Sequence, residues 1–222
     1  MKKAVLLLDN VCLKPSQIHK LRGFVGNLFR DYDVIHNHDV RTGKPIYRYP
    51  LIQFKMLDKT PAIIAVSDEA VKDFSKIFME LNKIVIDETE IPVYEKNLRC
   101  EDADFGYSEE QIVYEFLSPW IALNQENYRR YMGLSDKAEK SFMLRKALVG
   151  NLLSMSKSLG YWLGKEQEII ADAAVKEENV ILKGKPMLGF TGAFISNFII
   201  PDYLGIGKSV SRGFGTVRRI IY

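Results

Sequence analysis

Two of the three histidines in the chain stand two positions apart, at His36 and His38. In an extended segment, residues two apart point to the same side of the backbone. Two imidazoles on one side can supply both a base and an acid, because histidine titrates close to neutral pH. On RNA, one imidazole would take the proton from a ribose 2′-hydroxyl, which then attacks the adjacent phosphorus. The other would protonate the departing 5′-oxygen.

Basic and phenolic residues follow the histidine pair within a few positions. Lys44 or Arg48 could offset the negative charge that grows on the phosphate, and Tyr47 could hold the phosphate or orient a histidine. This set predicts cleavage without a metal ion. Two other interpretations of the pair stay open: a weak metal site completed by Asp33 or Asp39, and two exposed polar residues without a chemical role.

A glycine-rich, basic segment from Gly205 to Gly215 is the second candidate site. Glycines let a backbone approach a phosphate closely and point several N–H groups at it. The spacing matches neither a Walker loop nor a Rossmann fingerprint, and a plain turn between strands is the alternative. The residues that we predict to bind RNA, in this segment and elsewhere, are Arg41, Arg48, Gly205, Gly207, Lys208, Ser209, Ser211, Arg212, Gly213, Gly215 and Arg218.

Composition sets wide bounds. With 222 residues, 47% of them apolar, the chain can form one or two folded domains. The formal charge of +3 is modest, but residues 41–55 and 208–219 contain basic side chains and no acid. Such clustering indicates a groove for a polyanion, although two solvated loops would carry the same charges. The two cysteines match no zinc motif and predict no disulfide framework.

Membrane insertion and export are both disfavoured by the hydropathy pattern. No apolar run approaches the roughly 18 residues that a membrane span needs. The apolar run at 4–8 is too short for a signal peptide and is interrupted by Asp9 and Asn10. We therefore expect a cytoplasmic protein without membrane association.

The first half of the chain predicts strands at 4–8, 46–54, 62–66 and 83–87. One helix is expected after Pro15 and another after a cap at Ser67 or Asp68. The order β-α-β-β-α-β is the ferredoxin-like arrangement, and we expect it to fill a domain of residues 1–95. This fold constrains function weakly, but many RNA-binding domains use it.

The second half is less regular. A strand is predicted at 111–117, a long helix at 135–162 and strand-like residues interrupted by glycines at 180–200. No internal repeat or flexible linker is visible. We expect a second domain of residues 96–222 that packs closely on the first.

The pattern Gly-x-Gly at 205–207, five residues, then Gly-Phe-Gly at 213–215 resembles the glycine-rich loop of the RAMP superfamily of CRISPR-associated proteins. Three further stretches agree with this resemblance, at 47–55, 116–120 and 123–128. Together they make the chain similar to the Cas-six family of repeat-RNA processing endoribonucleases.

The resemblance implies an α+β fold of tandem ferredoxin-like (RRM-like) domains, the second one divergent. It also implies metal-independent cutting of CRISPR precursor RNA within its repeats, which leaves a cyclic phosphate and a 5′-hydroxyl and needs no cofactor. The family's usual histidine falls on His36 or His38, with Tyr47 and Lys44 as the assisting residues. CRISPR repeat RNA is then the expected partner, and other CRISPR effector proteins and a homodimer are further options.

Two rival functions stay open. Related RAMP proteins bind guide RNA without cutting it, and a pure binder has no use for the histidine pair. A metal-dependent nuclease could use His36, His38 and Asp39, but the chain lacks the dense carboxylate cluster of a two-metal site.

Overall fold

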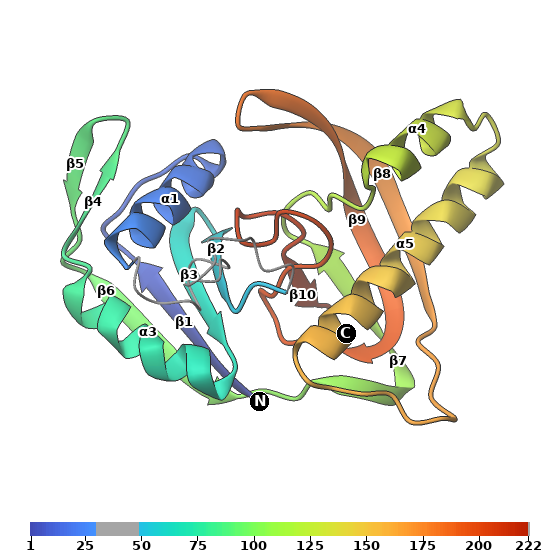
Figure 1. Cartoon of the computed structure of the whole chain (residues 1–222), viewed down its shortest axis with the longest axis horizontal. Helices are drawn as coiled ribbons and strands as arrows, with labels where there is room; N and C mark the ends of the chain where they lie inside the picture. The colour runs from blue at the N-terminus through green and yellow to red at the C-terminus, as the bar shows by residue number, and fades with distance from the viewer. Residues whose placement is uncertain (30–48, 222) are drawn as a thin grey trace, which may run out of the picture. The chain divides into compact units, whose positions relative to one another are not determined.

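The computed structural model describes residues 1–29 and 49–221, which form two compact units (Figure 1). Unit 1 is Met1–Ala103 with Val210–Gly213, and unit 2 is Asp104–Ser209 with Phe214–Tyr222. We expected the first domain to end at residue 95. Strand β6 (Lys96–Asp102) instead belongs to unit 1, because it pairs with β1 (Lys2–Leu8) along its whole length. Within the described residues, no helix is long and apolar enough to cross a bilayer.

The core of unit 1 is a four-stranded antiparallel sheet of β1, β2 (Ile52–Leu57), β3 (Thr60–Val66) and β6, in the order β2-β3-β1-β6. A short 3-10 turn, η1 (Pro15–Gln17), leads into α1 (Ile18–Leu28), which packs against β2. Helix α3 (Asp68–Glu80) packs against β1 and β3, and Ser67 caps it by accepting a hydrogen bond from the N–H of Ala70. The predicted β-α-β-β-α-β order is confirmed.

The prediction that residues 83–87 form the fourth strand of this sheet is wrong. β4 (Lys83–Ile86) pairs only with β5 (Thr89–Pro92), in a separate two-stranded hairpin. Asp87 and Glu88 make the turn between them with φ values of 51° and 65°, and two successive residues with positive φ are typical of the tightest hairpin turns. The chain therefore reverses at this turn, and β6 supplies the fourth strand.

Unit 1 also contains a buried lysine. The Lys55 side chain is fully buried, and its Nζ donates a hydrogen bond to the carbonyl oxygen of Val210 at 3.0 Å. Burial lowers the pKa of Lys55 to about 7, because loss of hydration disfavours the charged form. An isolated parallel bridge joins the neighbouring Phe54 to Arg212. The segment Val210–Gly213 is thus fixed at the edge strand β2.

Unit 2 contains a second four-stranded antiparallel sheet, made of β7 (Gly106–Phe116), β8 (Ala171–Leu182), β9 (Lys185–Ile199) and β10 (Val217–Arg219). Between β7 and β8 lie α4 (Gln125–Gly133) and α5 (Lys137–Ser158), and Figure 1 shows α5 running along β8. The predicted strand at 111–117 begins earlier, at Gly106, and the predicted long helix corresponds to α5. Aromatic side chains fill the core, including stacked Phe116 and Trp120.

The strand order of unit 2, β10-β7-β9-β8, repeats that of unit 1 when β7 takes the place of β1. The helix that should connect β9 to β10 is missing, and residues 200–216 contain turns and single bridges instead. This replacement is the divergence expected of the second ferredoxin-like domain. Most of the glycine-rich segment therefore lies in the connection from β9 to β10, whereas the corresponding connection of unit 1, from β3 to β6, contains the helix α3.

Two glycines of this segment make close backbone contacts within unit 2. Gly207 has a φ of +89°, and a Cβ there would lie 2.6 Å from Trp120 Nε1. Gly215 has a φ of +61°, and a Cβ there would collide with the carbonyl group of Ile206. Both positions therefore need glycine for space as well as for backbone conformation.

We expect Gly215→Ala to lower the free energy of unfolding by about 3 kcal/mol, since it combines a left-handed backbone with a collision against backbone atoms. Gly133→Ala in the same unit is the matched control, because an added Cβ there has no atom within 4 Å. Urea unfolding of both variants checks this expectation. Equal stabilities would show that the segment can move to accept a side chain.

The buried Lys55 predicts a specific dependence of stability on pH. In the unfolded chain its amine stays protonated up to about pH 10.4. Between its folded pKa of about 7 and that value the unfolded state binds more protons, so the folded state gains stability as the pH rises. From pH 7.5 to 9, the wild type should gain about 2 kcal/mol relative to Lys55→Met, at about 1.4 kcal/mol for each pH unit. Urea unfolding of both proteins at several pH values measures this difference. An equal change in the free energy of unfolding for the wild type and Lys55→Met would contradict the prediction.

Candidate functional site

The predicted catalytic residues His36, His38, Lys44 and Tyr47 lie outside the described residues, as do Arg41 and Arg48. Their roles stay predictions. Their segment connects α1 to β2 in unit 1. Among the residues that the structure does describe, no three His, Cys, Asp or Glu side chains gather closely enough to hold a metal ion.

The glycine-rich segment is divided between the units. Gly205, Gly207, Lys208, Ser209 and Gly215 belong to unit 2, whereas Ser211, Arg212 and Gly213 belong to unit 1. The predicted RNA-binding residues of the segment thus belong to both units.

Several backbone N–H groups of the segment are already used inside unit 2. The N–H of Lys208 donates to the carbonyl of Ile121 at 3.0 Å, and that of Gly215 donates to Pro119 at 2.9 Å. The N–H of Ile206 donates to the carbonyl of Gly215, also at 2.9 Å. These three groups cannot bind an anion without breaking bonds within the protein. Here the glycines allow close packing of the backbone.

The basic side chains in and after the segment have different surroundings. Lys208 is exposed and lines a pocket of unit 2. Arg218 forms an ion pair with Glu115, with its Nη2 2.7 Å from the carboxylate oxygen Oε1. A phosphate would have to share Arg218 with this carboxylate. Of the two, Lys208 is therefore better placed to bind RNA.

Unit 1 places two guanidinium groups near each other. Burial, together with the charge of Arg212, lowers the pKa of Arg22. Within the described ranges, neither arginine forms an ion pair with a carboxylate. Two like charges that are partly removed from water repel each other, and an anion between them would offset that repulsion. The pair therefore forms a candidate phosphate-binding site.

Sequence reasoning found Arg212 but missed Arg22. Arg22 lies in α1, between the buried positions Leu21 and Val25, and its sequence context gives no sign of a functional role. Its importance comes from the return of residues 210–213 to unit 1, where Gly213 lies against Ile18 with a φ of +96°. No local pattern could have predicted that contact.

Known proteins resemble this chain over its full length. Residues 2–104 match the family model of the Cas6b N-terminal domain, and residues 106–220 match that of the Cas6b C-terminal domain. A protein of Methanocaldococcus jannaschii is 48% identical over 118 residues, which are 53% of this chain and 78% of that protein.

Solved structures agree with the family models. A crystal structure of Cas6b is 36% identical, covers 99% of both chains and superimposes with a TM-score of 0.91. A CRISPR RNA processing endoribonuclease Cas6b is 34% identical, covers 99% of this chain and 100% of its own, and has a TM-score of 0.79. A RAMP protein that binds different RNA substrates shares the fold at 14% identity, with a TM-score of 0.58. With both domain models matched in succession, this chain belongs to the Cas6b family.

Proposed function

We propose that this protein is an endoribonuclease that cuts CRISPR precursor RNA within its repeats to give mature guide RNA. The observation that carries the proposal is the likeness, at 34% identity over 99% of this chain, to a CRISPR RNA processing endoribonuclease of the same family. The confirmed tandem ferredoxin-like fold agrees with it.

The proposed reaction needs no metal ion. His36 and His38 act as the base and the acid, so that the ribose 2′-hydroxyl attacks the neighbouring phosphorus and the 5′-oxygen leaves with a proton. The products are a cyclic phosphate and a 5′-hydroxyl. Lys44 stabilises the charge on the phosphate, and Tyr47 holds the phosphate or orients a histidine. These four roles rest on residue type and spacing in the segment between α1 and β2.

The described residues support RNA binding through side chains. Arg22 and Arg212 offer a phosphate two guanidinium groups without a carboxylate partner among the described residues. Arg is well suited to this task because its planar donors match phosphate oxygens. The other proposed contacts come from Arg41, Arg48, Lys208, Ser209 and Ser211, with Arg218 shared with Glu115.

The second candidate function is a RAMP-type protein that binds guide RNA without cutting it. Such a protein needs the arginine pair and Lys208 but not the histidines. Other CRISPR effector proteins as partners, a homodimer and a cytoplasmic location are proposals from the resemblance, and the described residues carry no feature that argues for them.

The first test is cleavage of repeat-containing RNA in the presence of EDTA, by the wild type and by a His36→Ala/His38→Ala double variant. Removing a general acid–base pair should slow cleavage by about 100-fold or more, with RNA binding retained. Equal cleavage by both proteins would remove the proposed mechanism. A wild type that binds but never cuts would favour the binding protein, and loss of cleavage in EDTA alone would favour a metal-dependent nuclease.

The second test replaces one ribose of the substrate. A 2′-deoxyribose just upstream of the scissile phosphate removes the attacking hydroxyl, so cutting should stop at that phosphate while binding stays within about twofold, because one hydroxyl contact is a small part of a phosphate-dominated interface. Gel assays of cleavage and of binding on the same RNA measure both quantities. Continued cutting would show that water is the nucleophile.

A further inference from the structure

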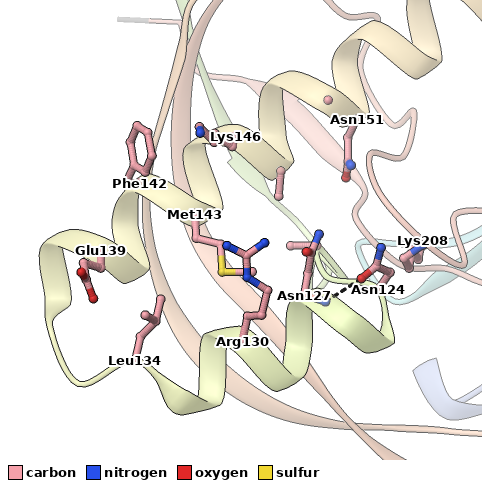
Figure 2. Close-up of a pocket in the computed structure, with 13 residues that line it drawn as sticks. Asn124, Asn127, Arg130, Leu134, Glu139, Phe142, Met143, Lys146, Asn151 and Lys208 are labelled. Carbon is pink, nitrogen blue, oxygen red and sulfur yellow. Dashed lines mark hydrogen bonds between the residues drawn. The ribbon is translucent and has the colours of Figure 1, made fainter.

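Unit 2 contains a pocket of about 550 Å³ between α4, α5 and the side chain of Lys208 (Figure 2). That volume lies within the range of about 300–1,000 Å³ that is usual for small-ligand sites. The arginine pair of unit 1 takes no part in it. One end of its lining is polar, and the other combines apolar side chains with the carboxylate of Glu139 (Figure 2).

The polar end presents hydrogen-bond donors whose orientation is fixed by the protein. Asn151 Oδ1 accepts a hydrogen bond from Nε1 of the buried Trp120 at 3.1 Å. Asn124 Oδ1 accepts one from the backbone N–H of Asn127 at 2.7 Å, where it caps α4. An indole nitrogen and a backbone N–H can only donate, so each amide must direct its oxygen to the protein. Among the described residues, the NH₂ groups of Asn124 and Asn151 have no acceptor, so they can donate to a ligand.

Three cations border the same pocket: Arg130, Lys146 and Lys208. Among residues 1–29 and 49–221, none of the three forms an ion pair. One carboxylate, Glu139, also lines the pocket, and Figure 2 shows it at the end away from Lys208. Three cations against one carboxylate, together with the oriented amide donors, select a ligand that is anionic and rich in acceptors.

The other end of the pocket offers an aromatic surface. Phe142 is 51% exposed and lines the pocket together with Leu134 and Met143 (Figure 2). Lys146 Nζ lies over its ring, 4.4 Å from the centroid. Inorganic phosphate would satisfy the donors and leave this apolar end unfilled. A short unpaired RNA segment satisfies both ends, with a phosphate at the donors and the base of a neighbouring nucleotide against the ring.

We propose that this pocket binds a short unpaired segment of the RNA strand. The inference rests on the proposed function for the identity of the polymer, and it adds a base-stacking position on Phe142 and a phosphate position at Asn124, Asn151 and Lys208. Because Lys208 belongs to the glycine-rich segment, the pocket extends RNA binding from that segment onto α4 and α5. The protein thereby holds the strand by stacking as well as by charge.

Fluorescence anisotropy with a labelled single-stranded repeat RNA tests this inference. Phe142→Ala should weaken binding by about tenfold, whereas Phe142→Tyr keeps a stacking ring and should bind as the wild type does. Asn151→Asp should also weaken binding by about tenfold. It keeps the acceptor for Trp120 but puts a negative oxygen where the NH₂ group was.

A charge-matched pair of variants separates the pocket from general electrostatics. Lys146→Gln removes one of the three cations that border the pocket and should weaken binding. Lys157→Gln removes the same charge from the same helix, at an exposed position that does not line the pocket, and should leave the affinity unchanged. Equal effects of the two variants would overturn the proposal.

A photocrosslink provides a readout that needs no variant. RNA carrying 4-thiouridine at successive positions should crosslink to the peptide that contains Phe142 and Met143 at one position. If the wild type binds and cuts repeat RNA while the pocket variants match it and no such crosslink forms, the pocket assignment fails and the proposed function stands. If the wild type does not bind repeat RNA at all, both fail together.

Discussion

The arrangement of unit 2 depends on the close approach of two backbone segments, residues 118–121 and 205–216. Gly207 and Gly215 allow this approach because a side chain at either position would collide with the neighbouring segment or with the loop itself. Hydrogen bonds from Lys208 to Ile121 and from Gly215 to Pro119 then join the segments. The side chains of Ser118 and Thr216 add a further bond at 2.9 Å. Buried backbone groups need such partners, since leaving them unpaired is costly.

The close approach of these two backbone segments also orients side chains that are distant from one another in the sequence. Trp120 belongs to the first of these segments, and its side chain lies against Gly207. Its indole N–H donates to Asn151 Oδ1 and so fixes the orientation of that amide on α5. The same contacts place Lys208 at the same end of the pocket as Asn151 (Figure 2). The ordering cost of these donors is therefore met when the protein folds and not when a ligand arrives, which is the usual basis of preorganised binding.

Much of the fold was predictable because it follows local patterns. The apolar runs at 4–8 and 62–66 located β1 and β3, and the cap at Ser67 or Asp68 located the start of α3. The periodicity of Leu144, Leu148 and Leu152 located α5. β6 was missed because its side chains are nearly all exposed, so its pairing with β1 leaves no apolar signal. The polar helix α4, with one buried side chain, was missed for the same reason.

The candidate sites show the same difference between features with a local sequence pattern and features without one. The glycine-rich segment could be predicted because its spacing is a local motif, but the use of its N–H groups within the protein could not. The pairing of Arg22 with Arg212 joins residues far apart in the chain, and so does the pocket at Asn124, Asn151 and Lys208. Contacts of this kind exist only after folding. The histidine segment stays a prediction from residue type and spacing.

The close backbone packing at Gly207 and Gly215 has a consequence for how the motif can differ among relatives. Since the glycines are required by backbone packing, the motif is constrained by architecture and not by the nucleotide sequence of the substrate. Relatives that process RNAs of different sequence can therefore share these glycines unchanged. The determinants that distinguish one substrate from another must then lie in the side chains beside them, which can vary without disturbing the scaffold.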